Sequence, residues 1–354
     1  MSLIADAVIH AYNFAPSNFA HERYSRRFAL GTYSHHKLWS PDDPRYILPE
    51  SQFLLDFDEE DVAAAVFGES PIDVAAYHAT PIFDFFKDGL VSMEKGARLK
   101  ERYPRRIIFY GAVPLVDRNE ALAILEEQVK TYRVDGIKFY PALYVNGRTI
   151  PTPIDSDDIA LPVIERAAEL GITNFAVHKS IPLGPTTTDP YRMDDVVVPA
   201  AKFPDLKFQI VHAGIAFTEE TAMLLHRFKN VYANLEGTSG YILRKPRVFY
   251  EAIGMMAEWG SYEQIIWASG CNLSHPRPLI EHFLAGSMPE DLVAGRGCPP
   301  LDARAKALIL GGNLLRLHGR PTSFEADFDD PFVQMRKESP EPWSRVRQRE
   351  AALS

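Results

Sequence analysis

The stretch "IADAVIHAYNF", residues 4–14, has the pattern of a buried strand that ends in polar side chains. Its first half is apolar, and His10 and Tyr12 follow at its end. Alternate residues of a strand point to the same side, so these two side chains are predicted to face one site. The chain repeats this arrangement of a short apolar run followed by polar residues, and the repetition decides the fold.

Eight apolar runs alternate with longer segments of helical periodicity. The runs lie at residues 5–12, 71–78, 107–115, 135–142, 174–180, 207–214, 230–237 and 264–272. Helical patterns include residues 120–133, 159–171, 219–228 and 303–316. The alternation predicts an α/β fold with parallel strands and crossover helices, and eight units predict a (β/α)8 TIM barrel. An open doubly wound sheet is the alternative, although no glycine-rich turn follows the first run.

We expect one barrel domain over residues 1–320, with two additions. Residues 15–60, rich in proline, histidine and aromatic side chains, are predicted to form a long, lid-like loop insert after the first strand. Residues 321–354 carry little apolar periodicity and are predicted to form an extended C-terminal tail.

The composition excludes several classes of partner. Of 354 residues, 46% are hydrophobic and 24% charged, which is ordinary for a soluble enzyme. The net charge of −9 argues against nucleic acid, and no apolar run approaches the ~20 residues of a membrane span. The N-terminus lacks the pattern of a signal peptide, and the two cysteines are too few for a disulfide framework. A cytoplasmic location is therefore expected.

Polar residues recur at the ends of the predicted strands, where a barrel places its active site. They are His10, Tyr12, Lys138, His178, His212, Glu236 and Asn272. A single histidine in such a place is commonly a buried, hydrogen-bonded residue. Imidazoles at the ends of strands one, five and six instead indicate a metal site, since imidazole binds zinc, iron and copper.

The roles of three of these residues stay open. Lys138 is either a cation that binds substrate or pairs with Glu236, or a carbamylated lysine that bridges two metals. Glu236 is a metal ligand, a proton shuttle or a partner that orients a histidine. Tyr12 is a metal ligand or a hydrogen-bonded residue of the wall.

The motifs "DAVIHAY", "DGIKFYP", "AVHKS", "IVHAG" and "ILGGNLLRLHG" resemble the amidohydrolase-related branch of metal-dependent barrels, from residue 3 to about 318. That branch includes decarboxylases and hydrolases of ring acids. Two departures stand out. Tyr12 occupies the place of a usual second histidine, and "ASGCNLSHP" has no carboxylate where the family has aspartate in a pattern like Ser-Asp-x-Pro. The resemblance leaves open a binding relative, a hydrolase with a relocated base such as Glu236, or other metal chemistry.

The third option resembles a smaller branch of these barrels, the non-haem diiron monooxygenases of platensimycin and platencin diterpenoid biosynthesis. That resemblance implies two iron ions and an external electron donor for hydroxylation of a bulky apolar acid, linked to coenzyme A. It also implies metal ligands at His10, Tyr12, His178, His212 and Glu236, with Lys138 and Asn272 as catalytic residues. A zinc-dependent hydrolase or decarboxylase is the alternative enzyme, and a metal-free binding barrel is the alternative without catalysis.

Two groups of side chains are candidates for substrate contacts. An apolar pocket is expected from Phe14, Phe19, Tyr24, Phe28 and Trp39. The phosphates of coenzyme A need basic contacts, for which the candidates are Lys179, Arg192, Arg244 and Lys245. A homodimer is expected by analogy with other barrels of this family.

Overall fold

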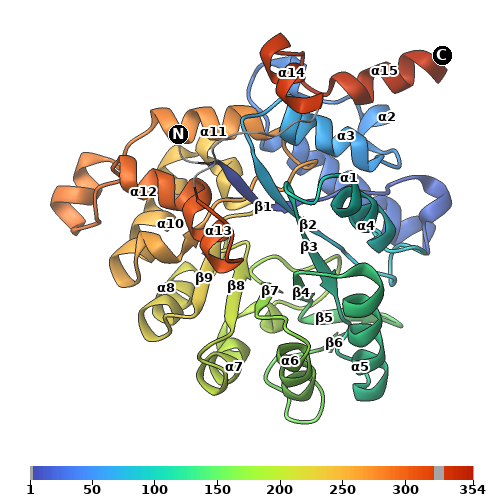
Figure 1. Ribbon diagram of the computed structural model, residues 1–354, viewed down its shortest axis with the longest axis vertical. Helices are drawn as coiled ribbons and strands as arrows, with labels where there is room; N and C mark the ends of the chain where they lie inside the picture. Colours follow the sequence, from blue (N-terminus) through green and yellow to red (C-terminus); the bar gives the residue numbers. More distant parts are fainter. Residues whose placement is uncertain (1–2, 323–330, 354) are drawn as a thin grey trace.

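The computed structural model describes residues 3–322 and 331–353. Its centre is one parallel sheet of eight strands in the order β1-β2-β3-β4-β7-β8-β9-β10, surrounded by helices (Figure 1). The strands are β1 Ala5–Ile9, β2 Val74–His78, β3 Ile107–Ala112, β4 Gly136–Phe139, β7 Asn174–His178, β8 Lys207–Val211, β9 Val231–Asn234 and β10 Ile265–Ile266. All eight predicted strands are confirmed, each with shorter bounds.

The first and last strands close the sheet into a barrel. Ile9 and Cys271 form a parallel bridge, and the Ala7 amide donates a hydrogen bond to the carbonyl of Trp267 at 2.9 Å. The amide of Gly270 donates to the carbonyl of Val8 at 3.1 Å. The TIM-barrel prediction is confirmed, and the open-sheet alternative is wrong.

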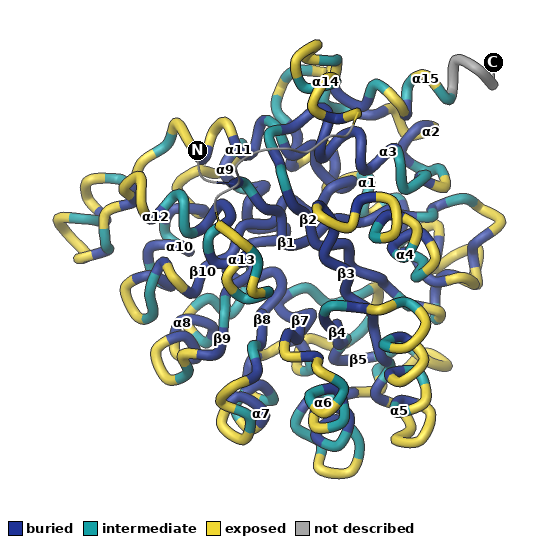
Figure 2. Tube along the Cα trace, viewed as in Figure 1, coloured by how far each residue is buried: buried dark blue, intermediate teal, exposed yellow. Residues whose placement is uncertain are grey.

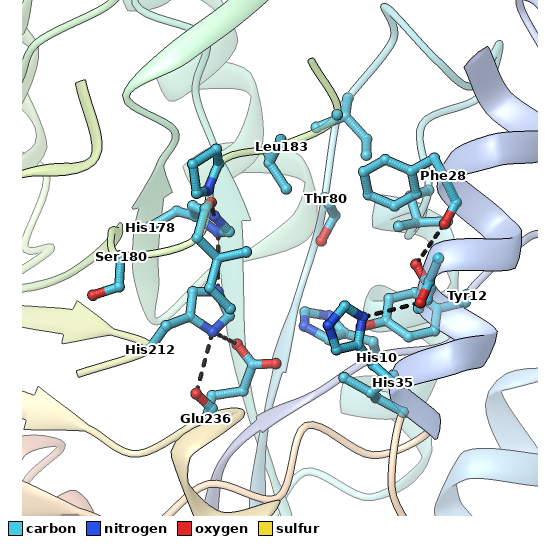
Figure 3. Close-up of a pocket in the computed structure, with 18 of the residues that line it drawn as sticks. His10, Tyr12, Phe28, His35, Thr80, His178, Ser180, Leu183, His212 and Glu236 are labelled. Atoms are coloured by element: carbon cyan, nitrogen blue, oxygen red, sulfur yellow. Dashed lines mark hydrogen bonds and ion pairs between the residues drawn. The ribbon is translucent and has the colours of Figure 1, made fainter. Parts of the chain in front are cut away.

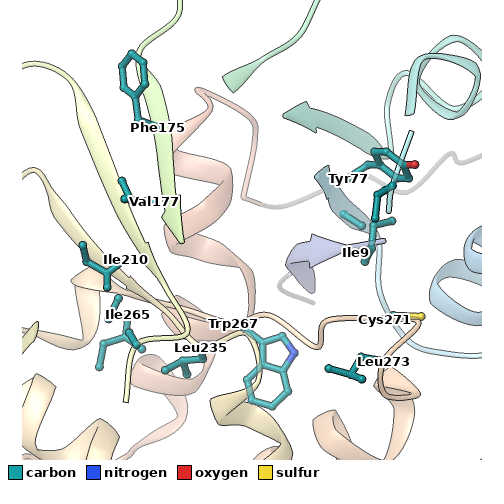
Figure 4. Close-up of a cluster of buried hydrophobic side chains, with 14 of the residues drawn as sticks. Ile9, Tyr77, Phe175, Val177, Ile210, Leu235, Ile265, Trp267, Cys271 and Leu273 are labelled. Carbon is teal, nitrogen blue, oxygen red and sulfur yellow. The ribbon is translucent and has the colours of Figure 1, made fainter. Parts of the chain in front are cut away.

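The strands are buried on both faces (Figure 2). Helices cover the outside of the barrel, and inward-facing side chains fill its interior. Between the strands and the surrounding helices, Phe175 stacks between Phe139 and Phe208, with ring centroids 5.8 and 5.5 Å away. Figure 4 shows part of the same core, with Tyr77, Trp267 and aliphatic side chains from several strands. This packing holds the strand ends in fixed positions around the mouth.

The helices follow the strands as predicted, with ends that differ by a few residues. They are α1 Glu22–Leu38, α2 Glu50–Phe53, α3 Glu59–Ala63, α4 Met93–Arg102, α5 Arg118–Glu127, α6 Ala160–Glu169, α7 Val197–Lys202, α8 Thr218–Arg227, α9 Tyr241–Arg244, α10 Pro246–Trp259, α11 Pro276–Ala285, α12 Ala303–Ala307, α13 Asn313–Leu317, α14 Pro331–Glu338 and α15 Ser344–Leu353. Within the described residues, we find no helix with the length and apolarity needed to cross a membrane.

The insert of residues 15–60 is largely helical, so its prediction as a loop is wrong. Its longest element is the 17-residue helix α1, which forms one wall over the barrel mouth. Only Ser25, Ala29 and His36 are buried on this helix, so its apolar stripe is narrow and its periodicity weak. A short hairpin of β5 Ala142–Val145 and β6 Arg148–Pro151 also follows β4 and was not predicted.

The described part of the C-terminal segment beyond residue 330 is largely helical, so the prediction of an extended tail is wrong there, while residues 323–330 and 354 of that prediction lie outside the described residues. Helices α14 and α15 lie beside α2 and α3 (Figure 1). Between them Trp343 is buried, and its amide donates to Glu69 at 2.7 Å. Glu69 also accepts from the amide and hydroxyl of Ser344 and lies 2.9 Å from Nε2 of His275. A buried carboxylate thus anchors the segment through polar contacts that leave no apolar periodicity.

Candidate metal centre and active-site chamber

A chamber of about 590 Å³ lies at the carboxyl ends of the strands (Figure 3). Its floor carries six of the predicted site residues, which are His10, Tyr12, Lys138, His178, His212 and Glu236. Helix α1 and the segment 180–185 after β7 form the walls. The structure therefore brings together side chains from five different strand ends, as the strand periodicity predicted.

His178 and His212 form an imidazole pair on this floor. Nδ1 of His178 lies 3.1 Å from Nε2 of His212. The outer nitrogen of each ring meets a backbone carbonyl, that of Ile181 at 2.7 Å and that of Glu236 at 3.2 Å. A carbonyl only accepts, so each outer nitrogen carries the ring hydrogen. The two facing nitrogens then present their lone pairs to each other, an arrangement that calls for a proton or a metal cation between them.

The backbone conformation at the ends of β7 and β8 orients the two imidazole rings. His178 is the last residue of β7, and His212 directly follows β8 with a φ of 67°. A histidine in this left-handed region is uncommon, and such conformations concentrate at functional sites. The turn is held by the amide of Ala213, which donates to the carbonyl of Asn234 at 3.1 Å.

Glu236 places a negative charge beside the pair. Its Oε2 lies 2.8 Å from Nδ1 of His212, but the ring N–H is directed at the backbone carbonyl. Among the described residues, Oε2 therefore has no directed hydrogen-bond donor. Burial alone would raise the pKa of this carboxyl, but His212, His10 and Lys138 outweigh it and lower the pKa to about 2. The carboxylate is ionised and is available to a cation.

His10 lies across the chamber from the pair (Figure 3). Its Nδ1 meets the carbonyl of His78 at 3.0 Å, and its ring stacks on Tyr12 with centroids 5.1 Å apart. Burial, reinforced by the nearby Lys138, lowers the pKa of His10 to about 3, so the ring is neutral. Burial also raises the pKa of Tyr12 well above its usual value, so its hydroxyl keeps its proton.

Lys138 is the cation of the floor. Burial lowers its pKa to about 8, against the opposing effect of Glu236. Its Nζ lies 5.2 Å from the centre of the Tyr140 ring, and the structure shows no ion pair between Lys138 and Glu236. Lys138 is therefore a buried ammonium that faces the chamber.

Asn272 occupies a different place from the other predicted site residues. It is fully buried, does not line the chamber, and its side-chain oxygen accepts from the amide of Tyr12 at 3.5 Å. Its position supports the backbone that carries Tyr12. His275, at the end of the same segment, contacts Glu69 instead of the chamber.

The side chains on the floor fit a metal ion by their chemistry. All three histidines direct one nitrogen to a backbone carbonyl, the usual way in which proteins orient metal-binding imidazoles. Within residues 3–322 and 331–353, however, no three His, Cys, Asp or Glu side chains are gathered as closely as a coordination shell. The fit is therefore best at the His178–His212 pair with Glu236 beside it, and His10 stands apart.

Several lining residues were missed or misplaced by the sequence. Tyr140, whose hydroxyl donates to Thr80 at 3.0 Å, lines the chamber two positions after Lys138, where strand alternation could have found it. Tyr24, Phe28 and Trp39 line the chamber as expected. Phe14 and Phe19 are not among the lining residues.

Three of the basic residues proposed for coenzyme A are already paired. Lys179 is buried and lies 2.6 Å from Asp195. The other two form ion pairs as well, Arg192 with Glu220 and Arg244 with Asp42. A cation that already holds a carboxylate is a poor phosphate anchor, so these candidates lose their support.

The fold and the chamber together define a class, the closed (β/α)8 barrels with a histidine-lined site at the carboxyl ends of the strands. The chain belongs to the Amidohydrolase family, whose model matches residues 34–320. The amidohydrolase resemblance is therefore confirmed. No curated protein is similar to the chain.

Solved structures show the same fold at low identity. An uncharacterised TIM-barrel protein of Bordetella bronchiseptica matches with a TM-score of 0.60 and 18% identity, over 90% of this chain and 99% of that one. The 2,6-dihydroxybenzoate decarboxylase of Rhizobium matches with a TM-score of 0.58 and 13% identity, over 90% and 99%. The 5-carboxyvanillate decarboxylase of Novosphingobium aromaticivorans, with bound manganese, matches with 0.58 and 14%, over 90% and 97%.

Proposed function

We propose that this chain is a metal-dependent decarboxylase or hydrolase that acts on a carboxylic acid with a bulky apolar body. The observation that carries the proposal is the imidazole pair, whose facing nitrogens lie 3.1 Å apart on the floor of the chamber. Ionised Glu236 would balance a divalent cation held there. Imidazole and carboxylate donors suit zinc, iron and manganese.

The walls of the chamber support an apolar substrate body. They include Phe28, Trp39, Leu183 and Ile215, and the volume of about 590 Å³ is that of a small-molecule site. Arg27 on α1 also lines the chamber, and the described residues provide it with no carboxylate partner. We therefore expect an acid that reaches Lys138 at the inner end and presents a second acceptor group to Arg27 at the outer end.

When bound, the metal would supply a Lewis acid that polarises an oxygen of the substrate. Lys138 would deliver the proton. In a decarboxylation the bond to the carboxyl carbon breaks, its electron pair stays on the substrate carbon, and the Lys138 proton replaces the lost CO2. An acid with a pKa near 8 suits this step at neutral pH. Hydrolysis fits less well, because a carboxylate with a pKa of about 2 is a weak base toward water.

Two of the similar structures are named as decarboxylases of ring acids, 2,6-dihydroxybenzoate and 5-carboxyvanillate, and this supports decarboxylation as the reaction. The test is to strip the protein with a chelator, restore manganese, zinc or ferrous iron without oxygen, and measure CO2 release from aromatic and alicyclic acids. We expect turnover with at least one of these metals. Turnover that appears only with oxygen and a reductant would contradict the proposal.

Oxygen-dependent hydroxylation by two non-haem iron ions is a second candidate, favoured by Tyr12. Its ring stacks on His10 at the floor of the chamber, and binding to iron would displace its proton to give a phenolate, a hard donor that suits ferric iron. This candidate needs an external electron donor and takes a bulky acid, which coenzyme A would carry. Under it, ferrous protein exposed to oxygen should develop a visible absorption band that Tyr12→Phe abolishes. Anaerobic turnover by the Tyr12→Phe variant would reject it.

A further inference from the structure

We infer that Gly270 is the positioning residue for Glu236, because the missing side chain at position 270 leaves the space that the Glu236 carboxylate occupies. The carboxylate of Glu236, which follows β9, and a side chain at position 270, which follows β10, cannot both occupy this space. The steric part of this inference is independent of the reaction. The part that assigns the carboxylate to a metal rests on the proposed function.

The backbone at Gly270 is held in place from two sides. Its amide donates to Val8 at 3.1 Å, and its carbonyl accepts from the amide of Leu273 at 2.7 Å. Its φ of 67° lies in the left-handed region that favours glycine. The segment therefore has little freedom to move away from a new side chain.

A side chain at 270 would meet the Glu236 carboxylate directly. A Cβ built on Gly270 would lie 2.8 Å from Oε1 and 3.2 Å from Cγ of Glu236. The first distance is shorter than real Cβ contacts, so the carboxylate would have to move. Because the carboxylate is buried beside His212, this movement would disturb the site and also cost stability.

Glu236 has no replacement in the chamber. It is the one carboxylate among the described residues that line it, and its side chain is buried beside His212. Displacing it removes the negative charge that balances a cation at the histidine pair. Conversely, a carboxylate attached at position 270 would enter the space that a shortened residue at 236 leaves free. Aspartate tolerates the left-handed region better than most residues.

The test combines four variants, Gly270→Ala, Glu236→Ala, the double Glu236→Ala/Gly270→Ala, and the swap Glu236→Ala/Gly270→Asp. Manganese binding to chelator-treated protein is measured by calorimetry, and the melting temperature Tm without metal. We expect Gly270→Ala and Glu236→Ala each to weaken manganese binding at least about tenfold, and the swap to recover a large part of that loss. The Tm loss caused by Gly270→Ala should shrink by several degrees in the Glu236→Ala background, where the space is free.

Gly297→Ala is the matched control, since Gly297 has a φ of 86° and no atom within 4 Å of a new Cβ. The Tm of Gly297→Ala should fall only by the strain of an alanine at positive φ, and this variant should bind manganese as the wild type does. Equal Tm losses for Gly270→Ala in both backgrounds, or a crystal structure of Gly270→Ala with the carboxylate still beside His212, would overturn the inference. If the wild-type protein binds no metal, the proposed function fails, while the Tm comparison still decides whether Gly270 positions Glu236.

Discussion

Nδ1 of His178 lies 3.1 Å from Nε2 of His212, although the residues are 34 positions apart in the chain. Their outer nitrogens are committed to backbone carbonyls, so the facing nitrogens are the ones left for a cation. The pair is thus oriented by the barrel before any ligand arrives. This preorganisation is the reason to expect metal binding at the ends of β7 and β8.

Removing either ring of the pair should abolish most metal binding. We expect His178→Ala and His212→Ala each to weaken manganese or zinc binding by at least about 100-fold. Removing a residue that only orients a metal ligand typically lowers metal affinity about 10–100-fold, and removing the ligand itself should cost more. Titration of chelator-treated protein measures this. His226→Ala, an exposed histidine on α8, should bind metal as the wild type does. Unchanged affinity in both pair variants would place the metal elsewhere.

Lys138→Met should lower kcat while leaving metal content unchanged. The buried ammonium is the proposed proton donor, and loss of a general acid costs about 10²–10⁴ in rate. Because the Lys138 pKa is lowered to about 8, wild-type activity should fall as the pH rises through that value. Lys130→Met, on the protein surface, is the control. If Lys138→Met keeps the wild-type kcat and its activity still falls at alkaline pH, Lys138 does not deliver the proton.

Arg27→Ala should raise KM about tenfold or more with little change in kcat. The guanidinium lies at the chamber wall, and a hydrogen bond from a charged group is worth about 1.5–3 kcal/mol. Steady-state kinetics test this, with whichever acid releases CO2 in the assay of aromatic and alicyclic acids. Arg23→Ala, on the same helix but outside the chamber, should leave KM unchanged. Equal KM values for the two variants would remove Arg27 from substrate binding.

Asp6→Asn should stabilise the protein at alkaline pH. Asp6 is fully buried in β1, and burial raises its pKa to about 7 from 3.8. Between these values the folded state binds a proton that the unfolded state has lost, so the free energy of unfolding falls as the pH rises. Above pH 7 that loss is complete and amounts to a few kcal/mol.

The asparagine variant keeps an acceptor for the amides of Val8 and Ser269, which contact Asp6 at 3.1 and 3.0 Å, but it carries no charge. Chemical denaturation at pH 4 and pH 8 should show a gain only at the higher pH. Asp158→Asn on the surface is the control. A gain of equal size at both pH values would mean that Asp6 does not titrate in this window.

The sequence by itself determined the barrel and most of the floor of the chamber. Strand burial is a local property, so eight apolar runs are visible without any knowledge of their neighbours, and parallel strands bring their carboxyl ends to one mouth. From this reasoning we correctly predicted that Lys138, Glu236 and the three histidines lie together at the mouth of the barrel. It missed helix α1, whose buried stripe is narrow, and the C-terminal helices, which a buried carboxylate anchors.

Only the tertiary structure decided how the predicted side chains relate to one another. It placed Asn272 outside the chamber lining, left His10 apart from the histidine pair, and seated the Glu236 carboxylate where Gly270 has no side chain. These outcomes depend on contacts between residues far apart in the chain. Such contacts exist only once the sheet has closed and β1 meets the segment after β10, so no local pattern encodes them.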